Sequence, residues 1–230
     1  MSDTDGFVAD DSVVGQSAGA PGATRDSRYW PVPVLRGVVA LAIAITITFS
    51  AEHSPLLGYL TFGILAVATA LILGLFGSAR LDRGTERSFF YGQAAVSLVA
   101  GIVALLSTGA GVPFLLFLVS AWAAITGFLE LYIGIRGRRR FAIAKDWLFT
   151  GALTALLAVV VLLIPADFAQ EFIGPDDVAR VLTASVIADG IIGAYAALLG
   201  VYLVIAGLSL KWGTGTAGAE PANPATQGGN

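Results

Sequence analysis

The stretch FLLFLVSAWAAITGFLELYIGIRGRRR, residues 114–140, decides the fold class. It is apolar over residues 114–135, and an arginine-rich run follows at once. Crossing about 30 Å of hydrocarbon takes about 20 residues of helix, because a helix satisfies all of its backbone hydrogen bonds within one segment. Residues 114–135 are therefore predicted to form a transmembrane helix with the arginines at the membrane surface.

Five further apolar runs, at residues 34–49, 56–76, 89–106, 147–164 and 186–210, have the same character. The chain is 13% charged, whereas soluble globular domains are about 25% charged. We therefore predict an all-α integral membrane bundle of six transmembrane helices over residues 29–212. Residues 1–28 and 213–230 have the composition of disordered extensions.

The basic residues beside the runs lie almost all on one side of the predicted membrane. They are Arg25, Arg28, Arg36, Arg80, Arg83, Arg87, Arg136, Arg138, Arg139, Arg140, Lys145 and Lys211. Because such residues are retained on the cytoplasmic side, both termini are predicted to be cytoplasmic in a multi-pass protein of the cell (plasma or inner) membrane. We expect the basic loops to contact anionic lipid headgroups and no nucleic acid. A homo-oligomer or another membrane partner is left open.

The composition excludes several chemistries. The chain has no cysteine and one histidine, which excludes disulfides, thiolate metal sites, a cysteine nucleophile and multi-histidine zinc sites. The six runs leave little chain for a soluble catalytic domain, and no nucleophile arrangement, phosphate-binding glycine loop or metal-ligand spacing is present. We expect no catalytic activity, no cofactor and no metal.

An internal repeat relates the three even-numbered runs. Three sets of small residues coincide when these runs are aligned: one is Gly63, Ser120 and Gly193, and two sets spaced by four are Ala66, Ala123 and Ala196, and Ala70, Gly127 and Gly200. The odd-numbered runs align more weakly, through Gly37, Gly92 and Gly151. Small residues spaced by four let helices approach closely in lipid. The sequence therefore predicts three repeated antiparallel hairpins, with the two sets of small residues forming helix-packing seams.

Polar residues inside the runs are costly and are therefore candidate functional residues. At 1.5 Å per residue, Arg36, Gln93 and Glu130 lie roughly 5, 7 and 9 Å inside the cytoplasmic ends of their helices. They share one layer, so Arg36 and Glu130 are placed to form an ion pair with Gln93 nearby. The alternative is that Arg36 reaches the headgroups, while Glu130 meets the arginines at the end of its own helix.

Two other aspartates are interpreted by position. Asp189 lies roughly 33 Å along the last helix from Lys211, which places it near the outer surface, across the membrane from the polar layer. Asp146 is expected to be the N-cap of the fifth helix. The last helix is expected to continue outward to about Pro175. Residues 166–180 are expected to lie along the outer membrane–water boundary.

Three short motifs carry a family resemblance: LRG at residues 35–37, WAAITGFLE at residues 122–130 followed by the basic run after Ile135, and LIP at residues 163–165. On these motifs the chain resembles the HdeD-like family of acid-resistance membrane proteins over about residues 29–212. The resemblance implies a cell-membrane location and a link to acid or general stress, without a catalytic mechanism.

Two functions remain open from the sequence. The first is a non-enzymatic bacterial membrane protein that supports acid or envelope stress tolerance through packing, lipid or partner contacts. The second is a small transporter or channel with a polar site at Arg36, Gln93 and Glu130. Internal repeats are common in transporters, although their sites usually lie nearer the bilayer midplane.

Overall fold

Six long helices make up most of the described part of the chain. The computed structural model describes residues 29–77, 85–138, 143–173 and 179–212. The helices are α2 (Pro31–Thr48), α3 (Pro55–Leu71), α5 (Thr85–Leu106), α6 (Gly111–Gly137), α7 (Ala144–Leu162) and α8 (Ala184–Trp212), with a π-helical turn η2 (Ile72–Gly77) continuing α3. Two strands, β1 (Ala169–Ile173) and β2 (Ala179–Thr183), join α7 to α8.

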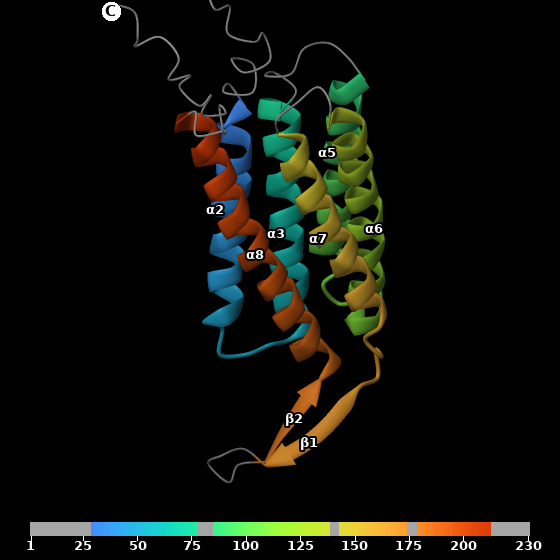
Figure 1. Cartoon of the computed structure of the whole chain (residues 1–230). Coiled ribbons are helices and arrows are strands. Elements are labelled where there is room, and N and C mark those ends of the chain that lie inside the picture. Colours follow the sequence, from blue (N-terminus) through green and yellow to red (C-terminus); the bar gives the residue numbers. More distant parts are fainter. Residues whose placement is uncertain (1–28, 78–84, 139–142, 174–178, 213–230) are drawn as a thin grey trace, which may run out of the picture.

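The six helices run side by side along one axis (Figure 1). Each is long and apolar enough to cross a membrane. The predicted all-α class, with six apolar helices of membrane-spanning length, is confirmed. The predicted disordered extensions, residues 1–28 and 213–230, lie outside the described residues.

The bundle has two chemically different ends. The starts of α2, α5 and α7 and the ends of α6 and α8 lie at one end, which we call the basic end because Arg87, Arg136, Lys145 and Lys211 lie there. The β1–β2 hairpin lies at the other, which we call the hairpin end (Figure 1). The first helix begins at Pro31, a residue that suits a first helical turn.

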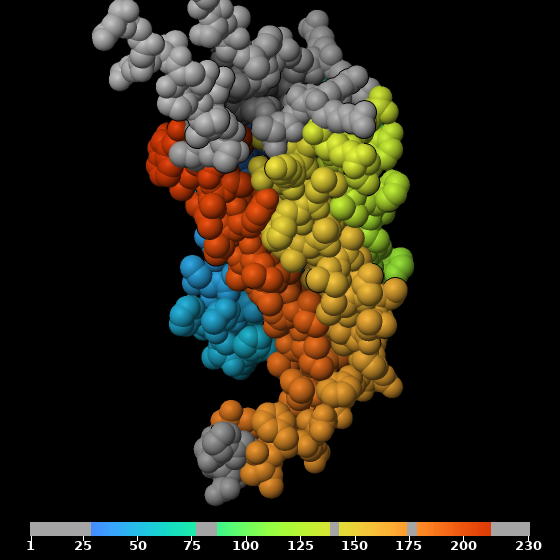
Figure 2. All heavy atoms as spheres, in the orientation of Figure 1, coloured from blue at the N-terminus to red at the C-terminus, as the bar shows by residue number. Residues whose placement is uncertain are grey.

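The segment between α7 and α8 differs from the prediction. The last helix begins at Ala184 rather than near Pro175, because Ala179–Thr183 pairs as a strand with Ala169–Ile173. The two strands contain Phe172, Ile173 and Val181, and aromatic and β-branched residues favour strands. The hairpin projects beyond the helix ends and stands clear of the helices in the space-filling view (Figures 1 and 2), rather than folding back across them. Pro175 itself lies outside the described residues.

Three helix pairs pack most closely: α2 with α8, α3 with α5, and α6 with α7. Glycines make each approach possible. A Cβ atom on Gly37 would lie 2.8 Å from the carbonyl oxygen of Gly200, and one on Gly101 would lie 2.9 Å from that of Gly63. A Cβ atom on Gly151 would lie 2.6 Å from the backbone nitrogen of Leu131. These are backbone contacts that no larger residue permits, and close packing is the main force between helices in lipid.

The predicted hairpins are not the most closely packed units. Each would join α2 to α3, α5 to α6, or α7 to α8, and these pairs pack less extensively than the three glycine-mediated pairs. The repeat aligns Gly92 with Gly37 and Gly151, yet a Cβ atom on Gly92 would have no neighbour within 4 Å. Gly92 therefore serves no helix crossing.

The small residues of the predicted seams all lie inside the bundle. Ala66, Ala123 and Ala196 have no exposed surface, and Ala70 is 4% exposed. Gly127 and Gly200 lie at the α6–α7 and α2–α8 crossings. The three alanines belong to the central hydrophobic core, where their small size leaves room for the large aromatic side chains.

Candidate functional site

A buried polar cluster forms where α2, α5 and α6 meet near the basic end. The Arg36 Nη2 atom donates to Glu130 Oε1 at 2.9 Å, and Gln93 Nε2 donates to the same oxygen at 2.6 Å. Arg36, Gln93 and Glu130 are only 9%, 2% and 4% exposed. Of the two arrangements expected from the sequence, the structure has the ion pair. Glu130 binds Arg36 across the bundle rather than the arginines at the end of its own helix.

Each member of the cluster comes from a different glycine-mediated helix pair. Arg36 is on α2, which packs on α8; Gln93 is on α5, which packs on α3; and Glu130 is on α6, which packs on α7. Charge-assisted hydrogen bonds are stronger than neutral ones, and more so where water is excluded. The cluster thus connects the three pairs at one point.

The cluster has unused hydrogen-bonding capacity. Within the described residues, Arg36 Nε, Gln93 Oε1 and Glu130 Oε2 have no hydrogen-bond partner. A cavity of about 20 Å³ lies beside Arg36, lined also by Tyr29, Asp146 and other residues of α2, α7 and α8. That volume holds about one water molecule, and the lining is partly polar, so the guanidinium is placed for hydration from the basic end.

Tyr29 closes this cavity just before α2 begins. It is 5% exposed and packs edge-on against Phe90, with ring centroids 6.0 Å apart. Burial raises the pKa of the Tyr29 hydroxyl, which therefore stays neutral at physiological pH. The hydroxyl adds no charge beside Arg36.

Asp146 has a different role from the predicted one. Helix α7 has Ile143 at its N-cap, so Asp146 lies in the first turn instead of capping it. Its Oδ1 atom accepts a hydrogen bond from the Tyr202 hydroxyl at 2.7 Å, which links α7 to α8, and Phe149 stacks on the Tyr202 ring. A carboxylate in a first helical turn still interacts favourably with the helix dipole.

Packed aromatic residues lie between the polar cluster and the hairpin end. Trp122 lies eight residues from Glu130 on α6, about 12 Å along the axis. Its indole Nε1 donates to Ser97 Oγ at 3.0 Å, and Phe62 packs edge-on against its ring at 5.2 Å. Trp122, Ser97 and Phe62 are all buried. The cluster is therefore closed on this side by tightly packed side chains.

Asp189 does not join the cluster. It lies near the hairpin end, at the other end of the bundle from the cluster as the sequence predicts, and its side chain is fully buried. Neither carboxylate oxygen has a hydrogen-bond partner within the described residues, and a Cβ on Gly58 of α3 would lie 2.7 Å from Oδ1. An unpartnered buried carboxylate is costly, so Asp189 contrasts with Glu130, which is bound by two partners.

Two of the polar contacts near the cluster could not be predicted from the sequence. Ser97 and Trp122 are 25 positions apart, and Asp146 and Tyr202 are 56 apart. Serine and tyrosine are common in membrane helices, so nothing singles out these partners before the helices are placed. Within the described residues, no group of three or more histidine or acidic side chains is arranged to hold a metal ion.

Comparison with known proteins identifies no relative of this chain. The chain matches no protein-family model, and no curated protein or solved structure is significantly similar to it. We therefore infer the function from the sequence and the geometry of the chain itself.

We predict different effects for the two buried carboxyl side chains. Glu130→Gln leaves the Arg36 charge buried without its counterion, which we expect to lower stability by about 3–5 kcal/mol. Asp189→Asn is also a replacement of a carboxylate by an amide of the same size, but it breaks no hydrogen bond or ion pair within the described residues. We therefore expect the midpoint temperature of unfolding to stay the same or rise. Thermal unfolding in detergent micelles, followed by tryptophan fluorescence, measures both. Equal losses in the two variants would refute the structural role of the Glu130 contacts.

Proposed function

We propose that this chain is a non-enzymatic multi-pass protein of the bacterial cell membrane that supports acid or envelope stress tolerance through packing, lipid or partner contacts. The observation that carries the proposal is the buried Arg36–Gln93–Glu130 cluster, whose charged groups bind one another between three helix pairs. The resemblance of residues 122–130 to the HdeD-like family supports the link to stress.

The orientation is part of the proposal. Arg87, Arg136, Lys145 and Lys211 lie at the basic end, whereas Glu52, Asp167 and Glu171 lie in or beside the connections at the hairpin end. The positive-inside rule then favours a cytoplasmic basic end, with both termini in the cytoplasm. The β1–β2 hairpin lies on the outer side in this orientation.

A packing role fits the surroundings of the cluster. Its only counterion contact in the described chain is internal, between Arg36 and Glu130. Trp122 and Phe62 fill the bundle beyond it. Buried polar contacts between membrane helices stabilise them by about 0.6–2 kcal/mol each, which suits a structural clamp.

One observation favours the second function, a small transporter or channel with its site at the cluster. The cluster has three unpartnered polar atoms, and the small cavity beside Arg36 has room for about one water molecule. A transport path would have to continue past Trp122 toward the hairpin end, where intramembrane polar groups are expected to line it.

Thiol labelling separates the two functions, because the chain has no cysteine of its own. Ser97→Cys places a thiol beneath the cluster, where Ser97 is fully buried, and Glu52→Cys places one at an exposed position as a control. Thiols react as thiolates and need water. We expect a membrane-impermeant maleimide to label Glu52→Cys and to leave Ser97→Cys unlabelled in intact and opened vesicles. Labelling of Ser97→Cys would favour the transport function instead.

Survival of the host tests the stress role. We expect deletion of the gene to lower survival in acid or under envelope stress, and a copy of the wild-type gene to restore it. Glu130→Gln should restore survival less well than Asp189→Asn when both are present at equal levels in the membrane, because it disrupts the clamp. Unchanged survival of the deletion strain across these stresses would contradict the proposal.

A further inference from the structure

An apolar groove runs between α5 and α6 on the outer surface of the bundle. It has a volume of about 390 Å³, and its lining includes Ala95, Val99 and Val103 of α5 and Leu118, Ala121 and Ile125 of α6. The groove exists because α5 and α6 are each held closely by another helix, α3 and α7, and pack less extensively on each other. The alanines in its lining keep it open.

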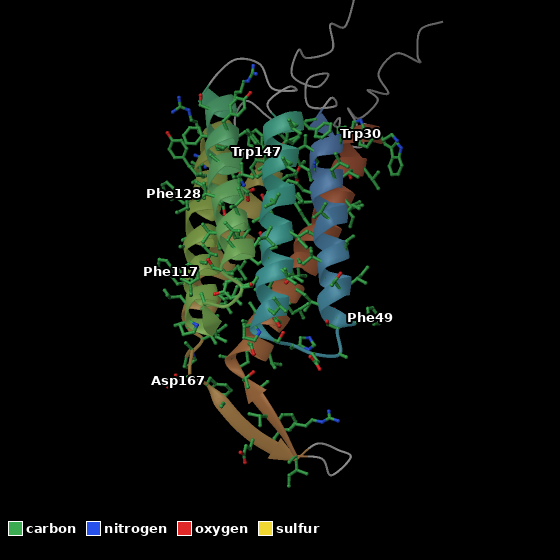
Figure 3. All side chains as sticks on the ribbon, turned by 180° about the vertical axis from the view of Figure 1, so that it is seen from behind. Trp30, Phe49, Phe117, Phe128, Trp147 and Asp167 are labelled. Atoms are coloured by element: carbon green, nitrogen blue, oxygen red, sulfur yellow. The ribbon has the colours of Figure 1, made fainter. Side chains whose placement is uncertain are left out.

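The face around the groove is directed toward lipid. Phe117 and Phe128 of α6 project outward from the side of the bundle (Figure 3) and are 64% and 66% exposed. Val99, inside the groove, is 62% exposed. A hydrocarbon chain is therefore the natural apolar ligand for this surface in a bilayer.

Two arginine–tyrosine pairs lie above the groove at the basic end. Arg87 Nη2 donates to the Tyr91 hydroxyl at 3.1 Å, and Arg136 Nη1 donates to the Tyr132 hydroxyl at 3.4 Å. The ring of Tyr132 contacts Phe89 of α5, with centroids 5.0 Å apart, so the two helices touch at this level.

The helical spacing aligns these pairs with the groove. Tyr91, Ala95 and Val99 follow one another at intervals of four residues, so each is a surface neighbour of the next on α5, and Arg87 reaches this row through its hydrogen bond to Tyr91. On α6, Tyr132, Ile125 and Leu118 follow at intervals of seven, which also keeps one face. The charged pairs and the groove therefore form a continuous surface.

The arginines retain capacity for an anion. Within the described chain neither guanidinium forms an ion pair with a carboxylate, and each is held by a neutral tyrosine hydroxyl. A guanidinium has five N–H donors and binds phosphate in a bidentate manner. The tyrosines hold the side chains without neutralising their charge.

We propose that this surface binds an anionic phospholipid, with the phosphate at Arg87 and Arg136 and an acyl chain running toward the groove. Ala95 lies eight residues below Arg87, about 12 Å along the axis. One leaflet of hydrocarbon is about 15 Å thick, and an acyl chain spans about that depth. An acyl chain whose phosphate lies at Arg87 is therefore long enough to reach the groove. The inference deepens the lipid-contact part of the proposed function by naming the lipid class and its site.

The test uses full-length protein in detergent, titrated with phosphatidylglycerol or phosphatidylcholine and observed by native mass spectrometry. We expect the wild type to bind phosphatidylglycerol about tenfold more tightly, which corresponds to about 1.4 kcal/mol. Arg87→Gln with Arg136→Gln should abolish this preference. Ala95→Leu with Ala121→Leu should fill the groove and weaken binding of both lipids while keeping the charges.

Matched variants control for charge and for bulk. Lys145→Gln with Lys211→Gln removes two positive charges from the same end, and Ala152→Leu with Ala194→Leu adds the same bulk to exposed positions on α7 and α8. Both controls should keep most of the preference for phosphatidylglycerol. Thermal unfolding without added lipid verifies that all variants are folded, and the binding readout does not depend on stress survival.

Four results would overturn the proposal. The first is a preference for phosphatidylglycerol that survives in the arginine variant, and the second is an equal loss of preference in the lysine control. The third is binding of glycerol phosphate, titrated in the same way, that is as tight as binding of phosphatidylglycerol, which would indicate a site for a free anion. The fourth is a wild-type dimer that the leucine variant converts to a monomer, which would indicate that a second copy of the chain covers the groove.

Discussion

A single carboxylate oxygen joins the three parts of this bundle. Glu130 Oε1 accepts hydrogen bonds from both Arg36 and Gln93, and these three residues belong to three different helix pairs. In hydrocarbon there is no hydrophobic force to bring helices together, since lipid tails are as apolar as the helix surfaces. A buried charge pair with a shared acceptor therefore has a large effect on which helices meet and at what height.

Within each pair, glycine has the corresponding role. Gly37 with Gly200, Gly63 with Gly101, and Gly127 with Gly151 let backbones come close enough for extensive van der Waals contact. The pairs then meet around large side chains such as Tyr59, Phe62 and Trp122, which the small Ala66, Ala123 and Ala196 accommodate. The looser contact between α5 and α6 leaves a groove on the surface. The same division into close pairs thus accounts for both the clamp and the surface that we propose for lipid.

The sequence predicts the six helices because the thickness of a bilayer sets the length of each apolar run. The retention of Lys and Arg on the cytoplasmic side sets the charges that flank it. Counting residues from the helix ends also places Arg36, Gln93 and Glu130 in one layer. The sequence does not show which helices pack most closely. Gly63 and Gly101 come into contact only once α3 and α5 are placed side by side, and Gly101 is not among the aligned repeat positions. The β1–β2 hairpin is not predicted because each strand forms only when it pairs with the other. The Asp146–Tyr202 contact is not predicted because 56 positions separate the two residues in the sequence.

Arg36 and Glu130 stabilise the bundle through each other, and a double-mutant cycle measures the coupling between them. Arg36→Met, Glu130→Gln and the double variant would be compared with the wild type by thermal unfolding in micelles. We expect the double variant to be more stable than the sum of the single losses implies, with a coupling energy of about 1–3 kcal/mol, because it leaves no buried charge alone. Losses that simply add would show that the two residues act independently and would contradict the account.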